Sequence, residues 1–402
     1  MIPPRLEPLL RADAPAGQLA ALFQDAGQEL ALVGGSVRDA LLDREIQDLD
    51  FTTDARPERI KEIVAPWAND LYLAGQRFGT IGAIHDGLLY EITTYRSEVY
   101  SEDSRRPDVA YSQDINEDLS RRDFTVNAMA LRLKRDGTPE LIDPHGGLAD
   151  MASQTLRTPL DPEVSFGDDP LRMLRLFRFL STIGFAPDEP ALRATATLAS
   201  RLEIISRERI QVELSKLIVG DHVADALWGL VQTGLADHFL PELSALELQQ
   251  DPQHRHKDVL AHSIAVCAKT QPILELRLAA LLHDIGKPAT RAFGPNGVTF
   301  HHHEVVGARM TRARLKELRY PRRQIKDVSD LVFLHMRPHT FKMGWTDSAV
   351  RRYVRDAGPL LDWLNELVRC DVTTRNEKRA RQIQRRIDEL EERIAVLREQ
   401  EE

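Results

Sequence analysis

The chain has 402 residues, of which 42% are hydrophobic and 29% are charged, so it is long enough for two or more packed domains. It contains no run of 18 apolar residues and only two distant cysteines, so we expect neither a membrane span nor a disulfide framework. The net charge of −9 argues weakly against a nucleic-acid partner, but arginines gather locally, and local basic patches can bind phosphates.

The N-terminal part of the chain predicts a small α+β domain. Its first residues lack the basic start, apolar core and cleavage site of a signal peptide, so we expect a cytoplasmic protein. Leucines at helical spacing predict a helix over residues 6–28. Between residues 29 and 145, short β-rich runs alternate with turns. Strands are expected at residues 30–33, 48–52, 80–85, 88–95 and 128–133.

From about residue 166 the apolar period is that of a helix, and almost all of the remaining chain is predicted to be helical. We place four segments at residues 1–165, 166–250, 251–375 and 376–402. In the last one, apolar residues alternate at spacings of four and three, as in a coiled coil. They are Ile383, Ile387, Leu390, Ile394 and Leu397. The chain stops at Glu402 without a helix stop signal, which favours a truncated tail.

A glycine turn lies between the first predicted strand and a predicted helix. It reads Gly34-Gly35-Ser36-Val37-Arg38-Asp39. Glycines let backbone N–H groups approach an anion, and the following helix start adds a positive field. The guanidinium of Arg38 can add a charge-assisted contact. The pattern therefore predicts a phosphate site, although such a turn is also a common plain connection.

Two carboxylates, Asp48 and Asp50, open the next predicted strand. Side chains two residues apart on a strand share a face, and paired carboxylates repel unless a cation lies between them. Mg²⁺ prefers oxygen ligands, and two such ions can activate a 3′-hydroxyl and stabilise a departing pyrophosphate. An isolated Asp-x-Asp is usually a solvated strand edge, but the nearby glycine turn favours a metal site. Glu91 is a candidate third carboxylate or an exposed strand residue.

These motifs resemble the head domain of the class II tRNA nucleotidyltransferases (CCA-adding enzymes) and bacterial poly(A) polymerases. Further motifs follow in the family's order: Arg121–Ala130, Asp143-Pro144-His145-Gly146-Gly147, Asp168-Asp169-Pro170-Leu171-Arg172 and Glu208–Glu213. The family carries Glu where this chain has Asp168. The resemblance covers roughly residues 30–370. It implies an α+β, polymerase β-like head with a mixed or antiparallel sheet, followed by an all-helical neck and HD-type body and tail domains.

The resemblance also implies an activity and its site. The activity is addition of C, C and A to the 3′ end of tRNA from CTP and ATP, without a template and with Mg²⁺ at Asp48, Asp50 and Glu91. Nucleotide-binding roles would fall to Gly34, Gly35, Ser36, Arg38, Arg122 and Asp123. Residues 97–108 would form the loop that switches the pocket from C to A, which favours complete addition. The alternatives are CC-only or A-only addition, a poly(A) polymerase, and an HD-type phosphohydrolase.

Base choice can be explained by Asp169 and Arg172. Together with Arg175 and Arg178 they lie at three-residue spacing on a predicted helix. A carboxylate only accepts hydrogen bonds and a guanidinium only donates them. Cytosine and adenine present an amino donor beside a ring-nitrogen acceptor and fit this pair, whereas uracil and guanine present the reverse. The alternative is a solvated arginine face on an amphipathic helix.

A second group of chemistry-bearing residues follows the order of the HD phosphohydrolase domain. The resemblance implies a further divalent metal (Mn, Ni or Mg) held by His262, His283, Asp284 and Asp371. His303 and His335 lie between the last two of these residues. The alternative is that this domain serves only as a helical body and an RNA surface.

Overall fold

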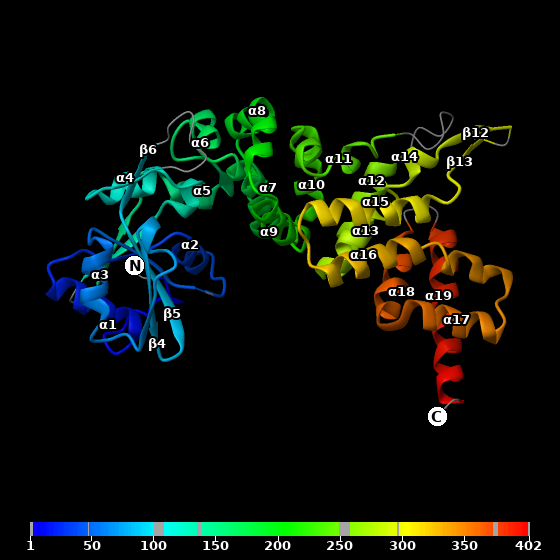
Figure 1. The fold of residues 1–402 in the computed structure, drawn as a ribbon, viewed down its shortest axis with the longest axis horizontal. Helices are drawn as coiled ribbons and strands as arrows, with labels where there is room; N and C mark the ends of the chain where they lie inside the picture. Colours follow the sequence, from blue (N-terminus) through cyan, green and yellow to red (C-terminus); the bar gives the residue numbers. More distant parts are fainter. Residues whose placement is uncertain are drawn as a thin grey trace. The chain divides into compact units, whose positions relative to one another are not determined.

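The computed structural model describes residues 3–46, 48–99, 108–134, 138–248, 258–295, 297–372 and 377–400. The chain divides into two compact units (Figure 1). The first comprises Met1–Asp169 and Ala186–Ala194, and the second comprises Pro170–Phe185 and Thr195–Glu402. Among the described residues, no helix combines the length and the apolarity that a bilayer crossing requires. The division into four segments stays a prediction, because its boundaries near 250 and 375 fall outside the described residues.

A seven-stranded sheet in the order β3-β4-β5-β2-β1-β8-β9 organises the first unit. Its strands are β1 (Ala31–Val33), β2 (Asp50–Thr53), β3 (Asp70–Tyr72), β4 (Thr80–His85), β5 (Leu88–Thr94), β8 (Ala130–Leu133) and β9 (Pro139–Ile142). The pair β2–β5 is parallel and every other neighbouring pair is antiparallel. The predicted α+β class with a mixed sheet is therefore confirmed.

Helices pack against both faces of this sheet, and one of these faces also carries the candidate site. The helices of the unit are α1 (Pro15–Asp25), α2 (Gly35–Leu41), α3 (Pro57–Val64), α4 (Ile115–Ser120), α5 (Gly147–Ala152) and α6 (Pro162–Asp168), with 3₁₀ turns η1 (Gln76–Phe78) and η2 (Thr125–Asn127). Alternate strand residues, among them Phe51, Ile81 and Ile92, are buried in one core with side chains of α1 and α3. Asp50 and Glu91 alternate with these residues and are exposed.

The predicted helix over residues 6–28 is too long. The α-helix α1 begins at Pro15, and the residues before it form turns. Proline is well suited to the first helical position but disfavours helical geometry in the residue before it, here Ala14. Leu6 and Leu10 are nevertheless buried. The apolar spacing therefore marked residues of the core correctly, but the helix predicted from it was wrong before Pro15.

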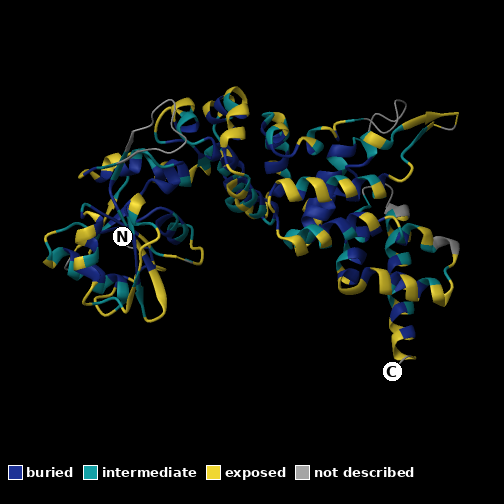
Figure 2. Ribbon diagram, in the orientation of Figure 1, coloured by how far each residue is buried: buried dark blue, intermediate teal, exposed yellow. Residues whose placement is uncertain are grey.

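The second unit is almost wholly helical, as predicted. Its helices are α7 (Leu171–Ile183), the last residues of α8 (Glu189–Leu198), α9 (Arg207–Ile218), α10 (Val223–Gln232), α11 (Pro241–Ser244), α12 (Val259–Lys269), α13 (Leu274–Leu282), α14 (Lys287–Thr290), α15 (His303–Glu317), α16 (Arg322–Leu334), α17 (Asp347–Ala357), α18 (Leu361–Cys370) and α19 (Glu377–Glu399). A hairpin of β12 (Ala292–Gly294) and β13 (Gly297–Thr299) interrupts them. Figure 2 shows buried residues along the inner sides of these helices.

The apolar seam of the C-terminal helix packs within the chain. Ile387, Leu390, Ile394 and Leu397 are buried where α19 lies against α17 and α18. Arg369 on α18 pairs with Asp388 at 2.7 Å and with Glu391 at 2.6 Å. The coiled-coil-like spacing is therefore used for intramolecular packing, because neighbouring helices of the same unit supply the partner surface.

Candidate functional site

Two carboxylates face each other on neighbouring parallel strands of the first unit. Asp50 opens β2, Glu91 lies in β5, and the strand register pairs them directly. Asp48 is also exposed but lies outside β2, which begins two residues later than the predicted strand. That Asp48 shares a face with Asp50 stays a prediction, whereas Glu91 is the residue that the sheet places beside Asp50.

The three carboxylates are coupled electrostatically. Partial desolvation raises the pKa of Asp50, the negative charges of Glu91 and Asp48 raise it further, and the positive charge of Arg122 opposes them. Oxygen donors that concentrate negative charge suit Mg²⁺. Among the described residues, the sets of three ligand atoms within 4.8 Å of one another lie in the second unit, so the head carboxylates share charge and register without forming such a compact set.

The glycine turn lies directly beside an arginine of the Arg121–Ala130 motif. Gly34 precedes α2 with φ 74°, a conformation that favours glycine. A Cβ atom on Gly34 would lie 3.1 Å from Nη1 of Arg122. The missing side chain therefore allows Arg122 to approach the turn, and it brings together two motifs that are far apart in the sequence.

A buried carboxylate holds Arg122 in this position. The side chain of Asp118 is fully buried and pairs with Arg121 at 3.1 Å and with Arg122 at 3.2 Å. Burial by itself would raise the pKa of Asp118, but the two guanidinium groups outweigh it and hold this pKa below its usual value. Arg122 is thus fixed next to Asp50, where a positive charge suits a triphosphate.

Asp123 and Arg38 belong to a buried hydrogen-bond chain. Asp123 accepts hydrogen bonds from the backbone N–H of Phe124 at 2.8 Å and from Nδ2 of Asn127 at 3.0 Å. The side-chain oxygen of Asn127 accepts from Nη1 of Arg38 at 2.6 Å, and Arg38 also pairs with Asp39 at 2.8 Å. Asn127, which sequence reasoning did not single out, therefore connects the arginine-containing motif to the glycine turn.

The Asp143–Gly147 motif packs against the same region. Asp143 accepts hydrogen bonds from the backbone N–H groups of Gly147 at 2.6 Å and Leu148 at 3.0 Å, and so holds the start of α5. A Cβ atom on Gly147 would lie 2.4 Å from the carbonyl oxygen of Thr125. Only glycine fits here, because the two backbone segments are in close contact.

The residues predicted for base recognition do not lie on one helix. Asp169 is the residue after α6, whereas Arg172, Arg175 and Arg178 lie on α7. Arg175 and Arg178 pair with the buried carboxylate of Glu213 on α9, at 3.1 Å and 3.0 Å. They therefore help to hold α7 against α9, a function that the three-residue spacing did not reveal.

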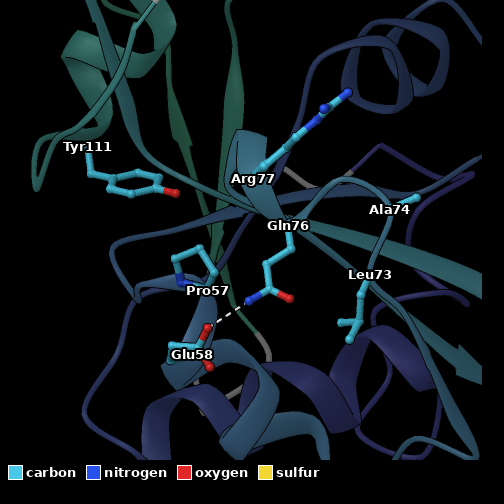
Figure 3. A pocket seen from close by; sticks show the side chains of 7 residues that line it. All are labelled: Pro57, Glu58, Leu73, Ala74, Gln76, Arg77 and Tyr111. Carbon is cyan, nitrogen blue, oxygen red and sulfur yellow. Dashed lines mark hydrogen bonds between the residues drawn. The ribbon is translucent and has the colours of Figure 1, made fainter.

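The predicted switching loop can be located only by its flanks. Strands β6 (Arg96–Val99) and β7 (Asp108–Tyr111) pair antiparallel, and residues 100–107 between them lie outside the described residues. A cavity of about 590 Å³ opens near β7 (Figure 3). It is lined by Pro57, Glu58, Leu73, Ala74, Gln76, Arg77 and Tyr111. None of the predicted site residues lines this cavity, so it adds nothing to the carboxylate site.

A cluster of imidazoles and carboxylates lies inside the second unit. The predicted ligands converge: His262 lies 2.8 Å from Asp371, and His283 lies 3.3 Å from Asp284 and 3.4 Å from Asp371. His262, His283 and Asp284 form one set whose ligand atoms lie within 4.8 Å of one another. This donor set fits a transition metal such as Mn or Ni.

A second set extends the cluster beyond the predicted residues. Asp284, His303 and His335 also have ligand atoms within 4.8 Å of one another, so Asp284 belongs to both sets. Three rings donate Nδ1–H to backbone carbonyls: His283 to Ala280, His303 to Phe300 and His335 to Val332. These bonds leave Nε2 as the ligand atom, which is how metal-binding histidines are usually oriented.

Neighbouring histidines of the cluster have pKa values that are shifted in opposite directions. Burial and the charge of His283 lower the pKa of His335 to about 3, so this ring is neutral at neutral pH. Burial opposes protonation of His283 too, but Asp284 and Asp371 raise its pKa to about 10. Lys287 pairs with Asp284 at 2.7 Å, and His339 lies 3.2 Å from Asp371. Sequence reasoning missed these last two partners, which follow Asp284 and His335 at helical spacings of three and four residues.

A mixed sheet with paired carboxylates, a glycine turn and arginines held by a buried carboxylate, followed by a helical unit with a histidine cluster, resembles a polymerase-type nucleotidyltransferase head and an HD-type domain. Comparison with known families agrees. Residues 30–157 match the poly A polymerase head domain, residues 184–246 match the domain described as a probable RNA and SrmB-binding site of polymerase A, and residues 259–392 match the HD domain. The head and the HD-type region of the chain thus each match a family model of their own.

Among curated proteins, the chain is 42% identical over 214 residues to the CCA-adding enzyme of Geobacillus sp. (strain WCH70), covering 53% of this chain and 51% of that protein. It is 39% identical over 245 residues to the CCA-adding enzyme of Lactobacillus helveticus, covering 60% and 59%. The matched regions thus span only about half to three fifths of these relatives.

Solved structures match over a longer part of the chain. The crystal structure of the Bacillus stearothermophilus CCA-adding enzyme in complex with CTP matches with a TM-score of 0.67 and 26% identity. The match covers 93% of this chain and 82% of that enzyme's chain. The Thermotoga maritima CCA-adding enzyme complexed with tRNA has a TM-score of 0.65 at 19% identity, covering 98% and 86%, and supports the fold alone.

Proposed function

We propose that this chain adds C, C and A to the 3′ end of tRNA, taking them from CTP and ATP without a template and releasing pyrophosphate. The observation that carries the proposal is the direct pairing of Asp50 with Glu91 on parallel strands, beside a glycine turn and Arg122. The names of the similar proteins support it, since the relatives and structures described above are CCA-adding enzymes.

The residues of the head divide the work. Asp48, Asp50 and Glu91 would hold Mg²⁺, which supplies activation of the 3′-hydroxyl and charge stabilisation at the departing pyrophosphate. Arg122, held by Asp118, places a fixed positive charge beside these carboxylates for the triphosphate. Gly34, Gly35 and Ser36 present a turn without bulky side chains, and Arg38 is held beside it by Asn127.

Nucleotide choice is assigned to Asp169 and Arg172, whose acceptor and donor groups complement cytosine and adenine. Arg172→Ala should narrow the preference for CTP over UTP about tenfold or more, since an unpaired buried polar group costs about 1–3 kcal/mol. The measurement is kcat/KM for CTP and UTP on a tRNA that lacks its terminus. Unchanged discrimination would contradict this assignment.

The overall activity is tested with a tRNA that lacks its 3′ terminus and with each labelled nucleotide in turn. Incorporation of CTP followed by ATP is the expected result. Incorporation of CTP alone or of ATP alone onto a CC end would indicate a partial enzyme, and a long ATP tract would indicate a poly(A) polymerase. Release of phosphate without extension would leave only hydrolysis.

The histidine cluster favours a second, metal-dependent function, which we propose to be hydrolysis of phosphate esters or 2′,3′-cyclic phosphate ends. Free Mn²⁺ or Ni²⁺ at a concentration one hundred times its Kd should raise the free energy of unfolding of the wild type by about 2.7 kcal/mol. His283→Ala should lose most of this gain, whereas His238→Ala, which removes a histidine bound to Glu203 outside the cluster, should keep it. Thermal unfolding with and without metal, and phosphatase assays, provide the measurement. Equal stabilisation of both variants would exclude this site.

A further inference from the structure

A lateral row of four residues crosses the sheet from the carboxylates to its edge. The register pairs Asp50 with Glu91, Glu91 with Gly82, and Gly82 with Tyr72. Directly paired residues on neighbouring strands point to the same face, so Tyr72 shares a face with both carboxylates. Since adjacent strands lie about 4.8 Å apart, the row spans roughly 14 Å from Tyr72 to Asp50.

Gly82 allows two larger side chains to close over the middle of this row. A Cβ atom on Gly82 would lie 2.9 Å from Cβ of Tyr72 and 2.8 Å from Cδ1 of Leu89. The glycine is buried, yet Tyr72 remains 52% exposed and Leu89 46% exposed. An apolar surface open to solvent therefore lies next to Glu91. We name the three residues Tyr72, Gly82 and Leu89 the Tyr72 platform.

The core of the sheet does not require this surface. The larger buried core of the unit lies on the opposite face, where Ile81, Tyr90 and Ile92 pack with α1 and α3. A smaller core on the carboxylate face, around Val33 and Ala130, includes neither Tyr72 nor Leu89. An exposed aromatic ring beside a charged site suits stacking on a nucleobase, since every base has a π-face. The platform itself carries no charged group. It therefore favours contact with the bases and not with the phosphate backbone.

We propose that the Tyr72 platform stacks the 3′-terminal bases of the RNA being extended and so directs the 3′-hydroxyl toward Asp50 and Glu91. The inference rests on the proposed nucleotidyl transfer. Tyr72 is a positioning residue, because the row keeps its ring away from Asp50. Addition of C, C and A changes the terminal base at each step, and stacking tolerates such a change, whereas Asp169 and Arg172 read base edges.

The experiment uses an RNA acceptor-stem minihelix whose 3′-terminal nucleotide carries the fluorescent base 2-aminopurine. Stacking on an aromatic ring quenches this base, so the wild type should lower its fluorescence on binding. Tyr72→Ala should lose most of the quenching and weaken RNA binding about 5- to 150-fold. It should raise KM for RNA more than KM for CTP. Tyr72→Phe should behave as the wild type, because it keeps the ring.

A matched pair of leucines provides the control. Leu88 and Leu89 are neighbours on β5 and both are exposed, but they point to opposite faces. Leu89→Ala should weaken RNA binding, and Leu88→Ala should not. Quenching that is absent in the wild type, or unchanged in Tyr72→Ala, would overturn the platform even if the protein extends tRNA. Quenching that depends on Tyr72 without any extension would support the platform and contradict the proposed transfer.

Discussion

Asp50→Asn should slow nucleotide addition about a thousandfold or more, which corresponds to roughly 4 kcal/mol of transition-state stabilisation. The substitution keeps the size of the side chain but removes the negative charge that faces Glu91 across the parallel strands. Binding of divalent metal and of the charged transition state should suffer, whereas the fold should not, because Asp50 is exposed. The measurement is the initial rate of labelled CTP and ATP incorporation over a range of Mg²⁺ concentrations.

Asp43→Asn is the matched control for this variant. Asp43 is another exposed aspartate of the same unit and pairs with Arg5 at the surface, and its φ of 56° suits asparagine equally well. The activity of Asp43→Asn should equal that of the wild type. Both Asp43→Asn and Asp50→Asn should keep the affinity of the wild type for RNA. A rate for Asp50→Asn within tenfold of the wild type would remove Asp50 from the site and with it the proposed transfer.

Asp118→Ala should destabilise the protein by about 3 kcal/mol, since removing one partner of a buried ion pair leaves its charge uncompensated. Two guanidinium groups, those of Arg121 and Arg122, lose their shared carboxylate. Because Arg122 also lies against Gly34, KM for CTP should rise as well. Urea unfolding measures the stability. Asn116→Ala on the same helix, an exposed position, should stay within about 0.5 kcal/mol of the wild type.

The contribution of Asp118 should depend on pH in a defined direction. The pKa of this group is lowered in the folded protein from its ordinary value of 3.8. Its stabilisation is therefore complete above that ordinary value and is lost as the pH falls through the lowered pKa. The stability difference between the wild type and Asp118→Asn should be constant near neutrality and shrink in acid. A difference that grows in acid would contradict the assigned ion pair.

The sequence predicted the class of the head domain and several of its strands because local signals were strong there. The predicted strand at residues 80–85 is β4, and turns containing Asp86 and Gly87 separate it from β5. The pairing of Asp50 with Glu91 was out of reach. It depends on β5 lying beside β2 while β3 and β4 occupy the outer positions, and no local pattern encodes that order.

Side-chain partners were the other limit. Arg175 and Arg178 have the spacing of a binding face, but their position opposite the buried Glu213 follows from the packing of α7 on α9. The histidine cluster shows the same effect, since Asp284 joins His303 and His335 into a second set that helix packing brings together. Residue types and order identify which groups are present, whereas tertiary contacts decide which of them meet.

The parallel β2–β5 pair also constrains how this protein can be assembled. Its two acidic residues come from segments separated by α3 and the β3–β4 hairpin, so closing that loop costs chain entropy before any contact is gained. Repulsion between the two carboxylates adds to this free-energy cost. Burial of the apolar side chains on the opposite face of the sheet must offset it. The carboxylate pair therefore forms only once the centre of the sheet is complete, and a nascent or partly unfolded head lacks it.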